Sequence, residues 1–176
     1  MDLIITPATI HTHRLLLRPY TVSLATAILN NQLEAIHALG LKPGEGWPDA
    51  DTLDTVPRIL KNLEKVDAPT GFESWMIIKK EDQAIIGDAG FKGVPNAAGQ
   101  IDIGYGIIAA ERKKGYALEA AKGLMQWAFT NDSVKEITAR CLVGNTASVK
   151  VLEKMGFNET SRDKGMIHWS FKKKLL

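Results

Sequence analysis

The chain has 176 residues, 45% hydrophobic and 24% charged, which is typical of one folded globular domain and not of a disordered chain. Its 22 basic and 20 acidic side chains leave a net charge of +2, so neither nucleic acid nor a membrane surface is an expected partner. The single cysteine, Cys141, excludes an internal disulfide and a cysteine-based metal cluster.

The first third of the chain predicts one strand and several short helices. Arg14–Arg18 is an apolar run that Pro19 ends, which is typical of a strand. Helical composition follows over residues 22–29 and 32–39. The glycine- and proline-rich stretch 42–48 predicts a loop.

Another helix should follow that loop, because Val56, Ile59, Leu60 and Leu63 recur at intervals of three and four. Its expected N-cap is Asp51 or Thr52, and Pro57 should lie in its first turns, where a missing N–H matters least. Trp47 lies in the preceding loop, where an aromatic side chain is expected to contact a substrate or partner.

The middle of the chain predicts strands. Residues 74–79 and 84–91 flank a short polar turn and should form a hairpin, and residues 100–108 should add a third strand. Short connections between consecutive strands favour an antiparallel meander.

The last third alternates between helices and strands. Helices are expected over residues 117–129 and 147–155, the second ended by Gly156, and a strand over 136–142 lies between them. Two strands, over 158–162 and 167–172, finish the chain. We therefore expect a single α+β domain over residues 1–176 with a mixed, mostly antiparallel sheet of six or seven strands.

The segment Arg112–Ala117 stands between a predicted strand and a predicted helix, with Gly115 just before the helix. Free N–H groups and the helix dipole make such a position an anion site, although strand–loop–helix joints also carry glycine and lysine simply to turn the chain. The chain has neither Gly-x-x-x-x-Gly-Lys-Ser/Thr nor Gly-x-Gly-x-x-Gly, which disfavours ATP hydrolysis and a Rossmann dinucleotide site.

This segment, Arg-Lys-Lys-Gly-Tyr-Ala, resembles the Gln/Arg-x-x-Gly-x-Gly/Ala motif of the GCN5-related N-acetyltransferase (GNAT) superfamily. Further segments in the right order are similar to its ribosomal-protein-alanine acetyltransferase (RimJ/RimL-like) branch: Thr12–Arg18, Ile103-Gly104-Tyr105, Asn145–Ser148 and Glu153–Phe157. The resemblance covers residues 12–157.

The resemblance implies the GNAT fold, with helices on both faces of the sheet and a V-shaped splay between the fourth and fifth strands, here 103–108 and 137–142. It implies acetyl-CoA as co-substrate and no metal, with pantetheine in the splay and a backbone N–H near Gly106–Ile107 polarising the thioester carbonyl. The implied cofactor-binding residues are Ile107, Ile108, Arg112, Lys113, Lys114, Gly115, Tyr116, Ala117, Asn145 and Ser148.

For catalysis, the resemblance places Ser148 as the acid for the departing thiolate. Asn145 is also a good N-cap residue with Ser148 three positions on, so both residues can instead serve the helix start. The family often has a glutamate base on the strand before the phosphate loop, where this chain has Asp102. Glu73, His168 or a water chain are the alternative bases.

The implied activity is N-acetylation of a primary amine by direct attack on the thioester, first of all on a protein or peptide N-terminal amino group. A small amine (polyamine, amino acid or antibiotic) and a non-catalytic acetyl-CoA-binding module are the alternatives. Acceptor choice should lie in residues 29–67 and 93–99. Met1–Ile5 lacks the features of a signal peptide, so we expect a cytoplasmic protein, either a monomer or a homodimer.

Overall fold

The computed structural model describes residues 7–174 of the chain. The strands are β1 (Ile10–His11), β2 (Leu15–Pro19), β3 (Lys42–Pro43), β4 (Ser74–Lys79), β5 (Ala84–Phe91), β6 (Gln100–Ile107), β7 (Glu136–Leu142), β8 (Asn158–Asp163) and β9 (Met166–Lys172). The helices are α1 (Val22–Leu29), α2 (Glu34–His37), α3 (Ala50–Leu63), α4 (Tyr116–Phe129) and α5 (Thr146–Met155).

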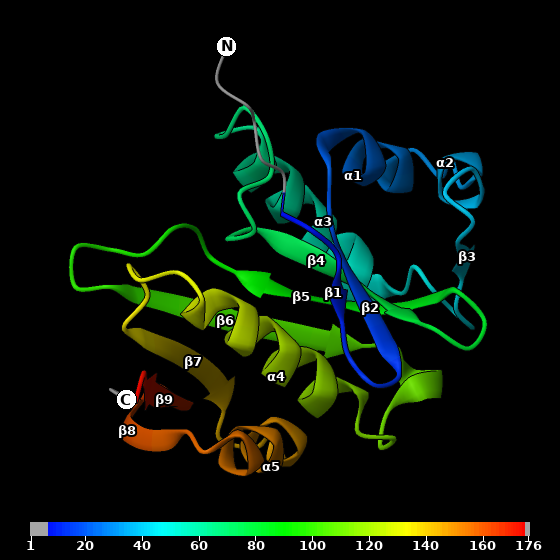
Figure 1. Cartoon of the computed structure of the whole chain (residues 1–176). Coiled ribbons are helices and arrows are strands. Elements are labelled where there is room, and N and C mark those ends of the chain that lie inside the picture. The colour runs from blue at the N-terminus through cyan, green and yellow to red at the C-terminus, as the bar shows by residue number, and fades with distance from the viewer. Residues whose placement is uncertain (1–6, 175–176) are drawn as a thin grey trace.

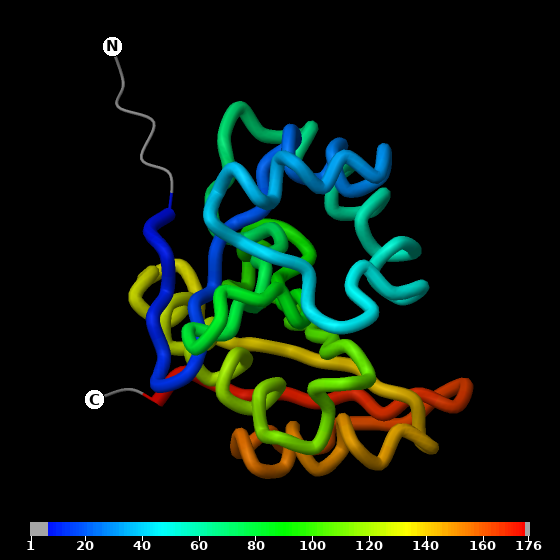
Figure 2. The backbone as a smooth tube through the Cα atoms, turned by 90° about the vertical axis from the view of Figure 1, so that its right-hand side faces the viewer, coloured from blue at the N-terminus to red at the C-terminus, as the bar shows by residue number. Residues whose placement is uncertain are grey.

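One sheet separates two layers of helices. Helices α1, α2 and α3 lie on one side of it, and α4 and α5 lie on the other (Figure 1). The quarter turn of Figure 2 shows the same separation, with the sheet between the two groups. Apolar residues of both sheet faces make one continuous core with these helices.

The strand order is β1-β2-β4-β5-β6-β7-β9-β8, with β3 beside β5. Only β3–β5 and β6–β7 are parallel pairs, so the predicted mixed and mostly antiparallel sheet is confirmed. Strands β6 and β7 pair only through residues 100–102 and 136–138, whereas β7 pairs with β9 as far as Leu142. The splay expected between residues 103–108 and 137–142 is therefore confirmed.

Within residues 7–174 the sheet has nine strands, where about six or seven were expected. The additional strands, β1 and β3, have two residues each, which is too short for any alternation to appear in the sequence. Strand β3 lies within the stretch expected to be only a loop.

Helix α3 differs from its prediction at the start. Its N-cap is Asp49, whose Oδ1 accepts the Thr52 N–H at 2.8 Å and the Thr52 hydroxyl at 2.7 Å, so the prediction of Asp51 or Thr52 as the cap was wrong. Pro57 consequently lies inside the helix and not in its first turns.

Trp47 is 4% exposed and belongs to the core, so the expectation that it contacts a substrate was wrong. The residues around it, Gly44 to Trp47, turn back onto β5, where Gly44 donates its N–H to the Ile85 carbonyl at 2.9 Å. Trp75 and Trp169 also belong to the core, at 0% and 4% exposure.

No helix within residues 7–174 combines the length and apolar character needed to cross a membrane. The segment Met1–Ile5 lies outside the described residues. The absence of a signal peptide and the cytoplasmic location therefore stay predictions.

Candidate functional site

The loop between β6 and α4 presents consecutive free backbone N–H groups. Gly115 is the N-cap of α4 in the left-handed conformation, at φ +82°, and Lys113 also has a positive φ of 62°. Within the described residues, no acceptor takes the backbone N–H groups of residues 113–118. The positive end of the α4 dipole lies at the same place. This loop has the geometry of an anion site.

A neighbouring segment braces the loop. Arg14 donates from Nη1 to the Lys114 carbonyl at 2.9 Å, pairs with Glu119 at 2.7 Å, and stacks on the Tyr116 ring 4.4 Å from its centre. Burial by itself would raise the pKa of Glu119, but hydrogen bonds from Thr12 and Arg14 hold that pKa below its usual range. The first turn of α4 is thereby tied to the beginning of β2.

Two basic side chains of the loop already have partners in the protein. Arg112 donates from Nε to the Ile107 carbonyl at 2.9 Å, and Lys114 pairs with Glu111 at 2.8 Å. The backbone N–H groups, more than these side chains, are therefore the free anion-binding groups of the loop.

A cavity of about 290 Å³ opens where β6 and β7 diverge. The Lys92 N–H donates to the Asp102 carbonyl, and the Ile108 N–H donates to the Ile86 carbonyl. The even-numbered residues of β6 therefore direct their backbone hydrogen-bonding groups toward β5. The alternation of an antiparallel pair then turns the N–H groups of residues 105 and 107 toward β7, beyond the last β6–β7 pair. An extended ligand with amide groups can pair with this edge as an added strand does.

Two hydroxyl groups line this cleft, Tyr105 of β6 and Ser148 of α5. Burial raises the pKa of Tyr105 to about 12, and the Ser148 hydroxyl partly offsets that rise. Within the described residues the buried Tyr105 hydroxyl donates to no acceptor, so it is a protonated donor. Asn145 is the N-cap of α5 and its Oδ1 accepts the Ser148 backbone N–H at 3.1 Å, so the capping role expected for Asn145 is confirmed.

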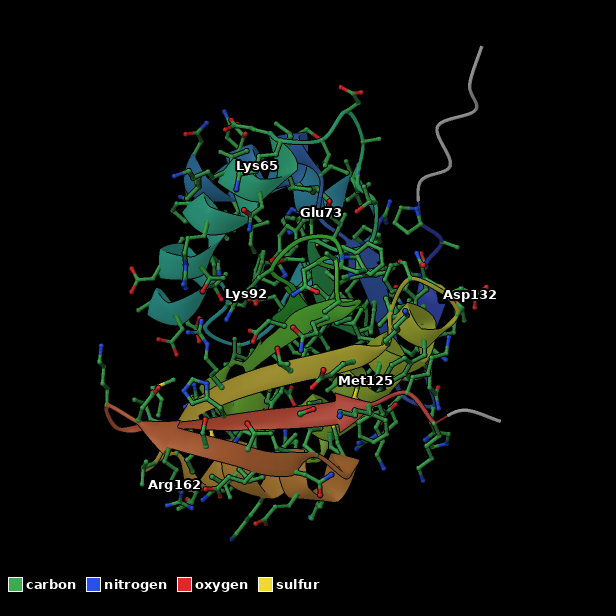
Figure 3. The ribbon with its side chains drawn as sticks, turned by 90° about the vertical axis from the view of Figure 1, so that its left-hand side faces the viewer. Lys65, Glu73, Lys92, Met125, Asp132 and Arg162 are labelled. Atoms are coloured by element: carbon green, nitrogen blue, oxygen red, sulfur yellow. The ribbon has the colours of Figure 1, made fainter. Side chains whose placement is uncertain are left out.

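A larger cavity, of about 630 Å³, lies between α3 and strands β5 and β6. Its floor includes Gly104 and Gly106, where an added Cβ would meet no atom within 4 Å. Gly104 and Tyr105 line this cavity and the cleft alike, so the two spaces meet at β6. In Figure 3, Lys65 lies just beyond the C-terminal end of α3, and Lys92 lies between α3 and the strands.

The floor of the larger cavity also carries Asp88, the only charged residue of β5, which pairs across the strands with Gly106. Burial raises the pKa of Asp88 to about 6; the charges of Asp49 and Asp51 add to that rise, while Arg58 opposes it. The sequence prediction missed Asp88. A lone carboxylate between glycines in an otherwise apolar strand was the signal that could have found it.

Residues 14–158 match the family described as the acetyltransferase (GNAT) domain. An uncharacterized N-acetyltransferase of Bacillus subtilis, YjdG, is 36% identical over 162 residues, which are 92% of this chain and 96% of that protein. The chain belongs to the GNAT acetyltransferase family. It is therefore an acetyl-CoA-dependent acyltransferase.

Solved structures share the fold of this acetyltransferase. The ribosomal-protein-S5-alanine acetyltransferase from Vibrio fischeri superimposes with a TM-score of 0.66 at 18% identity, covering 94% of this chain and 97% of that one. RimJ from Mycobacterium smegmatis, solved with CoA-disulfide, gives a TM-score of 0.66 at 23% identity, covering 94% and 88%.

The free groups of the acetyltransferase are of the kinds that acetyl-CoA needs. The N–H groups of residues 113–118 suit a pyrophosphate, and the unpaired edge of β6 suits the amides of pantetheine. The Tyr105 hydroxyl, a donor without an acceptor, lines the same cleft. Within residues 7–174 no group of three or more His, Cys, Asp or Glu side chains is placed to hold a metal ion.

The structure does not bring the base candidates of the sequence into either cavity. Asp102 pairs with Lys92 at 2.5 Å and accepts from the Thr138 hydroxyl at 3.0 Å. Glu73 is buried and accepts from the N–H and hydroxyl of Thr70, both at 2.8 Å. His168 lies 2.9 Å from Asp163 near the β8–β9 turn. None of the three candidates lines the cleft or the larger cavity.

Proposed function

We propose that this acetyltransferase moves the acetyl group of acetyl-CoA to the N-terminal amino group of a protein or peptide, as a member of the RimJ/RimL-like branch. The observation that carries the proposal is the pair of cavities that meet at β6, one suited to an extended co-substrate and the other open to solvent beside it. The RimJ and ribosomal-alanine acetyltransferase structures of the same fold support the branch.

The position of each residue sets its role in the proposed reaction. Acetyl-CoA supplies the thioester, and residues 113–118 hold its pyrophosphate. The Ile107 N–H faces the cleft and donates to the thioester oxygen as negative charge develops there. Tyr105 and Ser148 are the proton donors nearest the departing sulfur, and Tyr105 is the better placed because its hydroxyl lacks an acceptor.

Replacing Tyr105 with phenylalanine is expected to lower kcat about tenfold at pH 7, and Ser148→Ala to lower it less. A thiol has an ordinary pKa near 8.5, so its thiolate needs only modest help to leave, and the loss should shrink as the pH rises above about 8.5. Release of CoA thiol, followed across pH for both variants, measures this. If the loss of kcat in Tyr105→Phe did not depend on pH, the Tyr105 hydroxyl would not be a proton donor and its side chain would serve only in packing.

The acceptor side carries a row of cations. Arg58 and Lys61 on α3 and Lys65, two residues after its end, follow one another at intervals of three and four and line the larger cavity. Within the described residues no carboxylate forms an ion pair with any of the three. Such a row repels a polyamine and favours an acceptor that carries negative charge near its amine, such as a peptide with acidic residues after its N-terminus.

Reversing two of these charges, in Lys61→Glu with Lys65→Glu, is expected to raise KM for an acidic peptide roughly tenfold, since each exposed charge contributes up to about 1 kcal/mol. The same variant should improve the use of spermidine. Lys150→Glu with Lys154→Glu, on the exposed surface of α5 outside both cavities, is the matched control. If both double variants changed KM equally, Lys61 and Lys65 would have no part in selecting the acceptor.

The proposal as a whole is tested with acetyl-CoA and a panel of amines and peptides, with CoA release as the readout. Faster release with peptides than with free amino acids, antibiotics or polyamines is expected. Faster CoA release with a free small amine would instead support the alternative in which the acceptor is a small molecule. Tight acetyl-CoA binding without release on any acceptor would leave a non-catalytic binding module.

A further inference from the structure

Asp88 lies on the floor of the larger cavity, next to the strand along which the thioester is proposed to lie. Its cross-strand neighbour Gly106 has no side chain, so the carboxylate borders open space on the α3 side of β6. The next residue of β6, Ile107, turns its N–H to the unpaired edge of the same strand, beyond the last β6–β7 pair. An amine that reaches across Gly106 therefore lies between the carboxylate and the place where the thioester carbonyl is polarised.

Unlike the other carboxylates of the cavity, Asp88 is not engaged. Within the described residues its oxygens accept no hydrogen bond and form no ion pair. Asp49 caps α3, and Asp51 lies 3.6 Å from the Arg112 guanidinium. Asp88 is thus the carboxylate of this cavity that is free to receive an ammonium group.

We propose that Asp88 binds the acceptor ammonium and takes its proton as the general base of acetyl transfer. This proposal rests on the acetyl-transfer function proposed above. It assigns the role to a residue on β5 and not to Asp102 of β6.

The step balances without a further reactant. The R–NH₃⁺ group gives one proton to the Asp88 carboxylate, and the freed nitrogen lone pair forms the C–N bond to the thioester carbon. The C–S bond then breaks, and the second nitrogen proton goes to the sulfur by way of the cleft hydroxyls. Protonated Asp88 returns its proton to solvent through the open cavity.

The charged surroundings of Asp88 suit a base that works near neutral pH. Asp49 and Asp51 face it from the start of α3, Arg58 faces it from the same helix, and the buried Tyr20 hydroxyl faces it from the segment before α1. Lys61, Lys92 and Arg112 also line the cavity. With a pKa of about 6, the carboxylate is a stronger base than an ordinary aspartate and is still ionised at pH 7.

The test compares Asp88→Asn with Asp54→Asn, a charge removal on the exposed outer side of α3 that lines neither cavity. We expect Asp88→Asn to lower kcat by about 10²- to 10⁴-fold with acetyl-CoA affinity unchanged. The wild-type kcat should fall below pH 6, and the variant should lack that fall. Because a weakly basic amine needs less help, the loss should also shrink for acceptors of low amine pKa.

Thermal unfolding separates a lost base from a damaged fold. A carboxyl pKa that is higher in the folded than in the unfolded state lowers stability as the pH rises through the interval between them, here from about 4 to about 6. Asp88→Asn should therefore melt at or above the wild-type temperature at pH 7 and lose that advantage below about pH 4.

The assignment of Asp88 as the base would be overturned if Asp88→Asn kept the wild-type turnover. It would also be overturned if Asp102→Asn, and not Asp88→Asn, lost turnover and showed the altered pH profile. A stable Asp88→Asn whose loss is the same for amines of every pKa would also overturn it. If the wild-type protein transfers the acetyl group to no amine, the proposed function itself fails. That outcome differs from a failure of the Asp88 assignment, because it appears before any substitution is made.

Discussion

Gly106→Val is expected to give a folded protein whose turnover is at least 100-fold lower. Its Cβ would meet nothing within 4 Å, and a valine is favourable in a strand, so the sheet has no reason to unfold. The side chain would instead fill the floor of the larger cavity beside Asp88 and displace the acceptor. Misplacement of about 1 Å is enough for a loss of about 10²-fold.

Turnover, acetyl-CoA affinity and the melting temperature of Gly106→Val together decide this prediction. The neighbouring Gly87→Ala is the contrasting variant, because its Cβ would lie 2.1 Å from the Gly106 carbonyl oxygen. That variant should lose stability, whereas Gly106→Val should lose activity. Normal turnover in Gly106→Val would show that the acceptor does not cross this face of β6.

Gly115→Val is expected to weaken acetyl-CoA binding at least tenfold, about 1.4 kcal/mol, while the protein stays folded. Gly115 has a φ of +82°, which a β-branched residue adopts only under strain, and its Cβ would lie 3.4 Å from Nη2 of Arg14. Relief of that strain would turn the N–H groups of residues 113–118 away from the pyrophosphate.

Calorimetric titration with acetyl-CoA measures the effect of Gly115→Val. Gly40→Val is the matched control, since Gly40 has a φ of +73° with free space around it and lies outside both cavities. Both variants should lose some stability, but only Gly115→Val should lose affinity. An unchanged dissociation constant would remove this loop from the site.

Much of the fold was predictable because its signals are local. Strand β4 and helix α1 begin and end at the residues that their patterns predicted. Helix α2 lies inside the helix predicted over residues 32–39 but is shorter, with four residues. Strand β3, with two residues, is too short for its sequence to show any alternation. The cap of α3 was misplaced because Asp49, Asp51 and Thr52 are all good cap residues and only the three-dimensional path selects among them.

The candidate site was predictable on the co-substrate side and not on the acceptor side. The loop around Gly115 is continuous in the chain, so its residues could be read together. Burial and the charges of Asp49 and Asp51 raise the pKa of Asp88, and Gly106 across the sheet leaves space beside it, which no local pattern reports. Asp102 looked suitable by its position in β6, but Lys92 and Thr138 occupy its two oxygens.

The short pairing of β6 with β7 also couples the stability of the protein to the supply of its co-substrate. Only three residue pairs join these strands, so a ligand that lies along the open edge completes a sheet that the chain leaves unfinished. By mass action, acetyl-CoA at about 100 times its dissociation constant adds about 2.7 kcal/mol to the free energy of unfolding. Resistance to proteolysis through the unfolded state would then rise with the acetyl-CoA concentration, so the co-substrate would protect the enzyme as well as react on it.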